Sequence, residues 1–496
     1  MDSVCPSLSA RSLLPALTLL LVTLCARGEV PFGIRIIDEA TGRGVPLVTL
    51  STVNHIRLVT DSAGWAAFDE PGLMNREVFF SIASPGYAAP ADGFGYAGVR
   101  LTPTLGATTE VKIMRLLPAQ RLRRLTGQGI YRDSSLLGRE APLPRPLLNG
   151  DVMGQDSVQA APYRGRIFWL WGDTLLPPYP LGHFRSTGAW SDPPSTTGLP
   201  PQDGVHYEYL TDAEGGLAHL FPPVEKGAVW LAGLTSVKDG EGEERLIAHY
   251  GRYLALDQQV EQGVAEYDEE TRWFQPVVQL GEEFTWQHPD GHAVAVSNED
   301  TSWIHYATPF PLVRAPARAD DLVLPTNYEA YTWSEDLGWH WGKDAPPMTQ
   351  THERELIRQG RLPAAEARLQ IQSPEGRDVD AHAGSVRWNA FRQRWIMIFV
   401  QKGGDVSLLG EVWYAEAEEP TGPWRKAVRV ATHPHYSFYN PVQHPFFDQE
   451  NGRVIYFDGT YSSTFSDNTH PTPRYEYNQL LYRLELDDPA LSAAQK

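Results

Sequence analysis

Residues 154–174 read GQDSVQAAPYRGRIFWLWGDT, and an apolar run from Arg166 to Trp171 lies within them. A run of this length between polar turns predicts a buried strand. Four further runs of the same kind follow along the chain: Arg245 to Tyr253, Thr301 to Ala307, Arg394 to Val400, and Arg453 to Phe457. We interpret each as a middle strand of a four-stranded sheet. Five such sheets within residues 150–487 predict a five-bladed β-propeller, which removes its sheet edges by closing into a ring.

Residues 30–116 have a different pattern, in which short alternating strands are separated by tight turns. This pattern predicts an antiparallel β-sandwich. The stretches 38–46 and 84–87 resemble the carboxypeptidase regulatory-like, transthyretin-like modules of secreted proteins. The resemblance implies a structural or adhesive accessory. The expected fold class is therefore all-β, with an Ig-like or transthyretin-like sandwich followed by the propeller.

Two segments interrupt this plan. The basic stretch Arg121 to Arg124 and the proline-rich residues 142–146 predict that 117–149 is a linker packing on the propeller. Thr351 to Leu369 is charged and alanine-rich, which predicts a short helical insertion between the third and fourth blades. We favour a solvated surface helix there over a lid. Residues 488–496 are expected to form a tail.

The first residues resemble a secretory signal peptide. An apolar run from Leu13 to Leu24 precedes Ala26-Arg27-Gly28, a small-x-small cleavage pattern. Residues 1–28 are thus expected to be removed, leaving a secreted or periplasmic protein. Lipid attachment at Cys25 is less favoured, because Leu24 stands where a lipoprotein signal has a small residue.

The formal net charge of −19 narrows the choice of partners. An acidic chain repels nucleic acid and anionic lipid, and it is compatible with neutral, sugar-like substrates. No later apolar run is long enough to predict a membrane span. The sequence leaves the oligomeric state open.

A second resemblance concerns the propeller. GEVWYAEA at 410–417 followed by PTGPW at 420–424 resembles the outer blade strands of five-bladed propeller glycoside hydrolases of the arabinanase and fructosidase type. Residues 154–174 look like the opening blade of a related group of secreted bacterial propellers, some of which degrade arabinose-containing polymers. The resemblance implies a sugar at one mouth of the central funnel, with two or three carboxylates from different blades around it.

Four carboxylates are catalytic candidates: Asp156, Asp173, Asp380 and Glu411. Asp156 is expected to begin the innermost strand of the first blade, facing the funnel. Asp173 ends the next strand, where it is either a turn cap or a site residue. Asp458 takes the same place in the fifth blade, which favours the turn interpretation for Asp173. Glu411 begins a strand of the fourth blade and could project toward the mouth.

The segment RDVDAHAGS at 377–385 offers three polar side chains at alternate positions, Asp378, Asp380 and His382. On a strand they would share one face. They could hold a calcium ion, Asp380 could act as acid or base while His382 orients the substrate, or the three could form a hydrogen-bond network. Two carboxylates provide few oxygens for calcium, and no other cofactor is expected.

Aromatic and imidazole side chains gather before the last predicted middle strand. Tyr439, Asn440 and His444, together with Trp171 of the first blade, are candidate substrate-binding residues, because sugars stack on aromatic faces and accept directional hydrogen bonds. The alternative for each is ordinary core packing.

The sequence therefore predicts a secreted, glycoside hydrolase-like protein that acts on a poly- or oligosaccharide through carboxylate acid/base chemistry. The alternative is a non-catalytic glycan-binding or cell-surface module.

Overall fold

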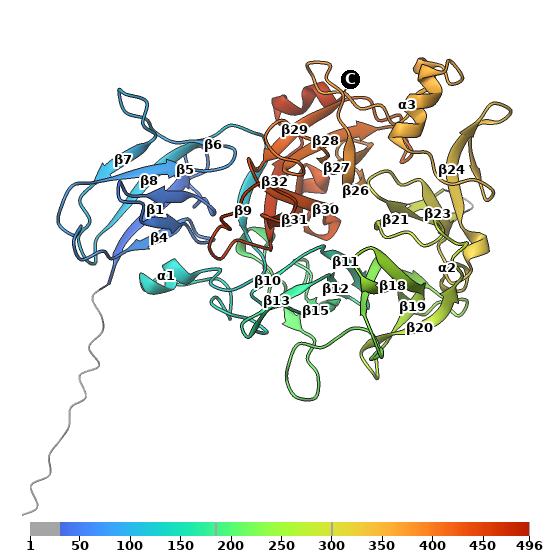
Figure 1. Ribbon diagram of the computed structural model, residues 1–496, viewed down its shortest axis with the longest axis horizontal. Helices are drawn as coiled ribbons and strands as arrows, with labels where there is room; N and C mark the ends of the chain where they lie inside the picture. The colour runs from blue at the N-terminus through green and yellow to red at the C-terminus, as the bar shows by residue number, and fades with distance from the viewer. Residues whose placement is uncertain (1–29, 184–185, 299–300, 496) are drawn as a thin grey trace, which may run out of the picture.

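The computed structural model describes residues 30–183, 186–298 and 301–495, and it contains a β-sandwich and a five-bladed β-propeller (Figure 1). The expected signal peptide, including Cys25, lies outside the described residues. Among the residues described, no helix is long and apolar enough to cross a membrane.

The sandwich consists of two four-stranded sheets. One has the order β4-β1-β8-β6 and the other β3-β2-β5-β7. Their strands are β1 (Phe32–Asp38), β2 (Thr49–Ser51), β3 (Arg57–Val59), β4 (Trp65–Phe68), β5 (Val78–Ala83), β6 (Tyr87–Ala88), β7 (Gly98–Leu101) and β8 (Thr108–Arg115). Alternate side chains such as Ile34, Ile36, Phe80 and Ile82 form one buried core. The predicted sandwich is confirmed, whereas its resemblance to a particular module stays a prediction.

Five sheets follow around a common axis, and Figure 1 shows them in chain order. Blade 1 is β11 (Gln159–Tyr163), β12 (Arg166–Trp171), β15 (Thr187–Ser191) and β16 (Glu208–Tyr209). Blade 2 is β17 (Ala228–Lys238), β18 (Glu244–Ala255), β19 (Gln258–Asp268) and β20 (Trp273–Leu280). Blade 3 has five strands, β21 (His292–Ser297), β22 (Ser302–Ala307), β23 (Val313–Pro316), β24 (Glu329–Ser334) and β25 (Gly338–Gly342). Blade 4 is β26 (Ala381–Asn389), β27 (Arg394–Gln401), β28 (Glu411–Ala417) and β29 (Ala427–Thr432).

Blade 5 takes its outermost strand from a distant part of the chain. Its order is β30 (Ser437–Gln443), β31 (Val454–Ser462), β32 (Asn478–Glu485) and then β9 (Gln120–Arg124). Residues 117–149, expected to be a linker, thus contribute a strand that pairs antiparallel with β32. The ring is closed by a strand that precedes the first blade, so no edge of β32 stays open.

The five predicted middle strands are confirmed as the second strand of each blade. Their apolar runs are continuous because both faces are buried between neighbouring blades. On β12, Phe168 and Leu170 pack toward blade 2, while Trp169 and Trp171 pack toward blade 5. Trp424 of the PTGPW turn is fully buried between blades 3 and 4.

A small sheet, three short helices and several 3-10 turns lie outside the blades and the sandwich. A small sheet joins β10 (Gly154–Gln155), β13 (Thr174–Leu176) and β14 (Tyr179–His183) beside blade 1. The helices are α1 (Arg132–Leu136), α2 (Ala319–Leu322) and α3 (Gln350–Arg358), and the short 3-10 turns are η1 (Pro201–Asp203), η2 (Pro325–Asn327), η3 (Ala364–Glu366), η4 (Pro445–Phe447), η5 (Glu450–Gly452) and η6 (Pro489–Gln495). The predicted helical insertion is α3 with η3. The carboxylate of Glu353 accepts the backbone N–H groups of Arg368 and Leu369, which ties the insertion to the chain that follows it.

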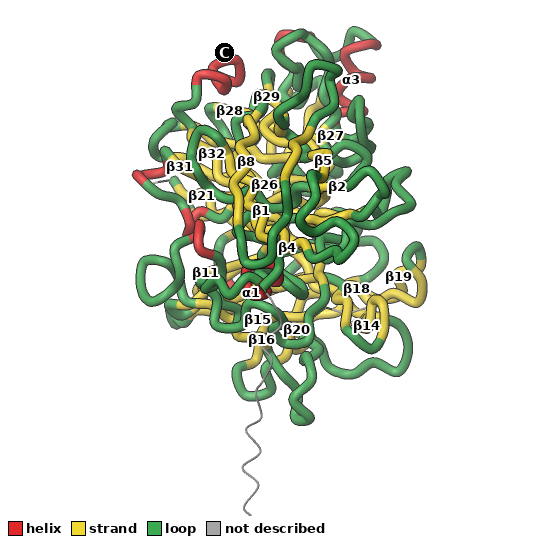
Figure 2. The backbone as a smooth tube through the Cα atoms, turned by 90° about the vertical axis from the view of Figure 1, so that its left-hand side faces the viewer, coloured by secondary structure: helices red, strands yellow, loops and turns green. Residues whose placement is uncertain are grey.

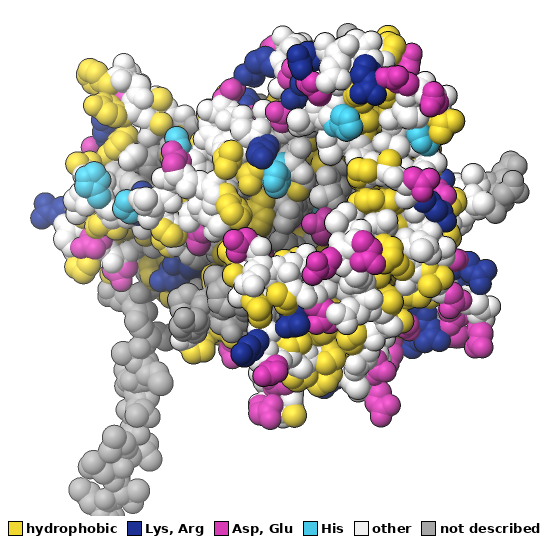
Figure 3. Space-filling model, turned by 45° about the vertical axis from the view of Figure 1, so that its right-hand side comes forward, with side chains coloured by type: hydrophobic (Ala, Val, Ile, Leu, Met, Phe, Trp, Pro, Cys, Tyr) yellow, Lys and Arg dark blue, Asp and Glu magenta, His cyan; other side chains and the backbone are white. Residues whose placement is uncertain are grey.

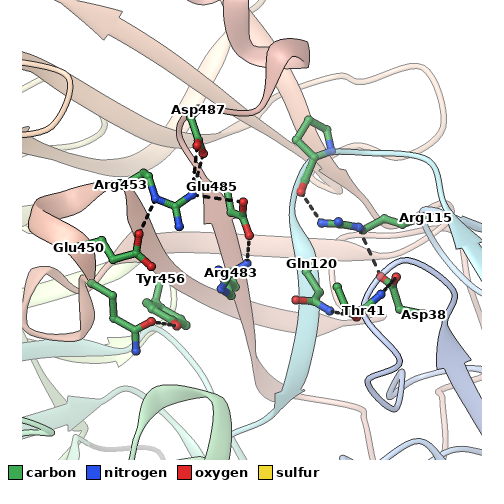
Figure 4. A network of polar contacts seen from close by, with 12 residues as sticks. Asp38, Thr41, Arg115, Gln120, Glu450, Arg453, Tyr456, Arg483, Glu485 and Asp487 are labelled. Carbon is green, nitrogen blue, oxygen red and sulfur yellow. Dashed lines mark hydrogen bonds and ion pairs between the residues drawn. The ribbon is translucent and has the colours of Figure 1, made fainter.

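The sandwich lies against blade 5 through β9 and the turn that precedes it. Gln120 Nε2 donates to Thr41 Oγ1 over 2.8 Å, and Arg115 contacts both Asp38 and the carbonyl of Pro118 (Figure 4). Figure 2, which looks from this side, shows β1 and β8 in front of the propeller. The sandwich and the closing strand therefore form one connected unit.

Arg121 connects the closing strand to the sandwich through three hydrogen bonds. It is buried, and its guanidinium donates to Pro46 O over 3.0 Å, Pro85 O over 2.8 Å and Ser84 Oγ over 2.5 Å, all in the sandwich. Hydrogen bonds from a charged donor contribute about 1.5–3 kcal/mol each, and their loss leaves buried acceptors unpaired.

We expect Arg121→Ala to lower the free energy of unfolding by at least about 3 kcal/mol in urea denaturation, because three charge-assisted bonds are lost at once. The matched control is Arg100→Ala, whose half-exposed side chain makes ion pairs of 3.8 and 4.0 Å and lies 5.7 Å from the ring centroid of Phe79, with no buried hydrogen bond among the described residues. It should change stability by no more than about 0.5 kcal/mol. Equal stabilities of the two variants would contradict a role for Arg121 in holding the sandwich on the ring.

Candidate functional site

A cavity of about 670 Å³ lies at one mouth of the ring. All five blades contribute to its wall, through Asp156, Trp230, Asp290, Ala383 and Asn440 in chain order. The inner strands β17, β21, β26 and β30 each have a residue in or just before them on this wall. Figure 3 shows acidic side chains spread over the visible surface of the molecule, in keeping with its negative charge.

Asp156 lies in the turn between β10 and β11, three residues before the first residue of the strand that it was expected to begin. Its Oδ1 accepts the backbone N–H of Asp173 over 2.9 Å, and its Oδ2 accepts the hydroxyl of Tyr439 over 3.1 Å. The hydroxyl of Tyr477 also bonds this carboxylate. Contacts from blades 1 and 5 thus fix the position of Asp156.

Gly172 allows the two aspartates to come together. A Cβ atom at this position would lie 2.4 Å from Asp156 Oδ1, so any larger residue would displace the carboxylate. The backbone bonds Gly172 N to Asp156 O (3.0 Å) and Asp156 N to Asp173 O (3.3 Å) hold the two turns side by side. The glycine of the sequence WGDT is therefore required by this close approach.

Asp173 lies just beyond β12 and extends into the cavity. Its Oδ1 accepts the indole N–H of Trp230, on the inner strand of blade 2, over 2.7 Å. Burial raises the pKa of Asp173 to about 7, the Trp230 hydrogen bond partly offsets that rise, and the negative charge of Asp156 adds to it. Near neutral pH this carboxyl group therefore retains its proton much of the time.

The two aspartates differ in how many donors they meet. Burial raises the pKa of Asp156 too, but hydrogen bonds from Tyr477, Tyr439, the Asp173 backbone and Ser157 favour its charged form. Asp173 receives a single side-chain donor. Asp156 consequently ionises first, and its charge then holds the proton on Asp173.

An aromatic wall stands beside this pair. Trp230 and Tyr253 lie with ring centroids 5.1 Å apart, tilted by 57°, and both line the cavity. Gln259 and Gln262 of the adjoining strand add amide groups. Flat aromatic faces next to directional amides suit the alternating apolar and hydroxyl surfaces of a sugar ring.

The wall of blade 3 contains three residues that were not predicted from the sequence: His288, Asp290 and His292 of WQHPDGHAV. Asp290 is an exposed carboxylate whose backbone carbonyl accepts Gln159 Nε2 over 3.2 Å. His288 donates to Tyr250 O over 2.9 Å, and burial lowers the pKa of His292 to about 3, so this imidazole is neutral. The available signal was an acidic turn directly before an alternating strand, the same arrangement as at Asp156.

Among the predicted binding residues, the cavity includes one and adjoins another. Asn440 lines it and donates from Nδ2 to Ser157 Oγ over 2.7 Å, while Tyr439 lies behind Asp156 as its hydrogen-bond donor. Trp171 is fully buried against Trp169 and Tyr207, and His444 is buried with its Nε2 3.0 Å from Asp458 Oδ1. These last two side chains belong to the core, where a substrate does not reach them.

Asp458 does not occupy the place of Asp173, as the sequence had suggested. β31 continues to Ser462, so Asp458 lies in mid-strand and is completely buried, whereas β12 ends at Trp171 and leaves Asp173 in the cavity. The two aspartates are therefore not equivalent, and the turn interpretation of Asp173 that Asp458 favoured is wrong.

The remaining candidates lie away from the cavity. Asp380 precedes β26 and pairs with Arg354 of α3 over 2.6 Å, and His382 is exposed beside it. Glu411 is buried within blade 4, with Arg429 Nη1 3.3 Å away. Since β26 begins only at Ala381, strand alternation does not bring Asp378 and Asp380 onto the face of His382, and no three acidic, histidine or cysteine side chains in the described residues are grouped to hold a metal ion.

α3 does not cover the cavity either. None of its residues contributes to the cavity wall, and its buried Leu356 packs in the core between blades 3 and 4. The arrangement agrees with a surface helix attached to the rim.

No protein-family model and no curated protein matches the sequence. Solved structures with a related arrangement include an exo-β-1,3-galactanase from Phanerochaete chrysosporium, with a TM-score of 0.34 and 8% identity over 68% of this chain and 61% of that chain. An exo-1,5-α-L-arabinanase from a bovine ruminal metagenomic library has a TM-score of 0.34 and 8% identity over 68% and 94%. An endo-1,5-α-L-arabinanase from Thermotoga petrophila has a TM-score of 0.33 and 11% identity over 68% and 72%. The matched region thus spans less than two thirds of the galactanase, and similarities at this level do not bear on activity.

The raised pKa of Asp173 has a consequence for stability. The folded chain retains this proton up to about pH 7, whereas an unfolded aspartate loses it near its ordinary value of 3.8. Between these pH values the folded state binds more protons than the unfolded state. The free energy of unfolding therefore falls as the pH rises from about 4 to 7, and this contribution falls no further above pH 7.

We expect Asp173→Asn to raise the midpoint of thermal unfolding at pH 8, with a gain that shrinks as the pH falls below 7. Asp268→Asn is a control of opposite sign, because hydrogen bonds from Thr271 lower the pKa of Asp268 and its charged form is the favoured one. A difference between Asp173→Asn and the wild type that stays constant from pH 5 to 8 would rule out the raised pKa.

Proposed function

We propose that the chain is a glycoside hydrolase-like protein that binds a neutral poly- or oligosaccharide in the propeller cavity and cleaves a glycosidic bond there. The observation that supports this most is the pair Asp156 and Asp173, held together in one cavity but with unequal affinities for a proton. Glycoside hydrolysis needs one protonated and one ionised carboxyl group.

The proposed roles follow from the donors that each group meets. Asp173 gives its proton to the glycosidic oxygen as the C–O bond breaks, and the leaving sugar departs as an alcohol. Asp156 acts in its ionised form, either by accepting a proton from the water that attacks C1 or by bonding C1 itself before water releases the sugar. The anomeric configuration of the first product distinguishes these two courses.

The surrounding side chains would position the sugar. Trp230 and Tyr253 offer stacking faces, and Asp290 and Asn440 offer polar groups from blades 3 and 5. The apolar segment Leu13 to Leu24 further supports a location outside the cytoplasm, where polysaccharides are found.

The test is a digestion screen on neutral arabinans, xylans and galactans, followed by variants assayed on whichever polymer the wild type cleaves. Asp156→Asn and Asp173→Asn should each lower kcat by about 10²–10⁴-fold, because each removes one partner of the acid/base pair. The matched control Asp380→Asn, in a carboxylate outside the cavity, should retain activity.

Two results would overturn this assignment. Full activity of either cavity variant would remove the pair from the chemistry. Binding of a glycan without cleavage by the wild type would instead identify a carbohydrate-binding module, in which the aromatic wall does the recognition.

The pH profile provides an independent prediction. Activity should fall as the pH rises through about 7, since Asp173 then loses the proton that it must donate. Trp230→Phe removes a donor that favours the ionised form of Asp173, so this limb of the kcat profile should move to higher pH.

Trp339→Phe is the control, because its indole N–H donates to Glu366 O, remote from the pair. An alkaline limb that moves equally in both variants, or in neither, would show that Trp230 does not tune Asp173.

A further inference from the structure

A second hollow, of about 210 Å³, lies between blades 3 and 4 at the far end of the strands that reach the central cavity. On β21, His292 lines the central cavity and Ser297 lines the second hollow. Five residues of strand at ~3.3 Å each separate the two sites by about 16 Å. The hollows share no lining residue, so a ligand in one does not occupy the other.

The blade 3 wall of this hollow is built around Arg314. Its guanidinium lies between the rings of Trp303 and Trp341, 3.9 and 4.1 Å from their centroids. Nε and Nη2 both donate to Glu329 Oε2, over 2.9 and 2.7 Å. Stacking and the ion pair together fix the three side chains as one rigid surface.

Polar atoms remain available on this surface. Within the described part of the chain, Arg314 Nη1 donates no hydrogen bond. The indole N–H of the half-buried Trp341 also has no acceptor among these residues. Fixed donors beside aromatic rings are the elements from which sugar-binding sites are made.

The facing wall comes from the turn between β28 and β29 of blade 4, through Glu419 and Thr421. Glu419 pairs with Arg368, and its side chain is 62% exposed, so the carboxylate retains accepting capacity toward the hollow. Thr421 contributes a hydroxyl group. The ligand would therefore meet donors on one wall and acceptors on the other.

Charge decides the class of ligand. Glu329 neutralises the charge of Arg314, and Arg368 neutralises the charge of Glu419. Burial lowers the pKa of His305 to about 3, so this imidazole is uncharged. An anion would face the carboxylate of Glu419, which lines the hollow. A cation would find the place between the two indoles already filled by Arg314. The hollow suits a neutral ligand with several hydroxyl groups.

We propose that this hollow is a second saccharide-binding site, which holds a neutral sugar unit away from the site of cleavage. The identification of the hydroxylated ligand as a saccharide rests on the proposed function, whereas its neutrality and hydrogen-bonding character come from the hollow itself. A volume of about 210 Å³ is much more than one water needs, and we expect a single sugar ring to be the unit accommodated.

The test is isothermal titration calorimetry on the full chain carrying Asp173→Asn, which is expected to slow cleavage by about 10²–10⁴-fold, with xylotriose and β-1,3-galactotriose as probes. We expect two sites per chain. Adding Trp341→Ala should weaken one of them at least tenfold and leave the other unchanged, and Trp230→Ala should do the reverse.

Trp339→Ala is the matched control. Trp339 lies two residues away on the same strand, is also half-buried and stacks on Tyr331, but it does not line the hollow. Glu419→Ala, at an exposed side chain, is a second variant that should weaken the same site without disturbing the core.

The outcomes separate the two proposals. The second site alone would be overturned if cleavage needs Asp156 and Asp173 but saccharide binding is equal in the three variants Trp341→Ala, Glu419→Ala and Trp339→Ala. Binding that is lost in Trp341→Ala and Glu419→Ala, in a chain that cleaves nothing, would support the second site and reject the proposed reaction. Tighter binding of trigalacturonate than of either neutral trisaccharide at this site would contradict the assignment of a neutral ligand.

Discussion

The pairing of β9 with β32 is the constraint on which the rest of the propeller depends. A ring of sheets removes its edges only if the last blade meets the first, and here a strand that precedes blade 1 completes blade 5. This closure brings blade 5 beside the turn that holds Asp156. The hydroxyls of Tyr439 and Tyr477 reach that carboxylate only because the ring is closed.

The same constraint links the sandwich to the site. β9 follows the sandwich directly, and Arg121 donates from it to three acceptors of that domain. The sandwich is thus attached to the strand that closes the ring. Within the ring, the close approach at Gly172 and the unequal numbers of donors give two neighbouring aspartates different proton affinities. A cavity that contains one ionised and one protonated carboxyl group is equipped for acid/base chemistry on a neutral substrate.

The sequence predicted the features that depend on local pattern. The run Arg166 to Trp171 is continuous because alternate side chains pack on two different blades, and the four runs like it repeat for the same reason. Asp156 and Asp173 were candidates because one was expected to begin the innermost strand of the first blade and the other to end the apolar strand that follows it.

What could not be predicted depends on contacts between distant residues. Arg121 to Arg124 read as a basic linker, since nothing in a single sequence shows that β32 would otherwise have an open edge. Asp173 and Asp458 looked equivalent because strand ends are not visible in the pattern, and Asp380 looked like a site residue until its ion pair with Arg354 was seen. Asp290 precedes an inner strand as Asp156 does, but its place on the cavity wall depends on how blade 3 meets the other blades, which the local pattern does not show.

The proposed reaction depends most on the unequal protonation of the two aspartates, and ¹³C NMR titration of the aspartate carboxyl groups measures it directly. Resonances are assigned with Asp156→Asn and Asp173→Asn. We expect Asp156 to ionise at the lower pH and Asp173 to retain its proton until about pH 7. Ionisation of both groups together near the ordinary value of about 4 would contradict it.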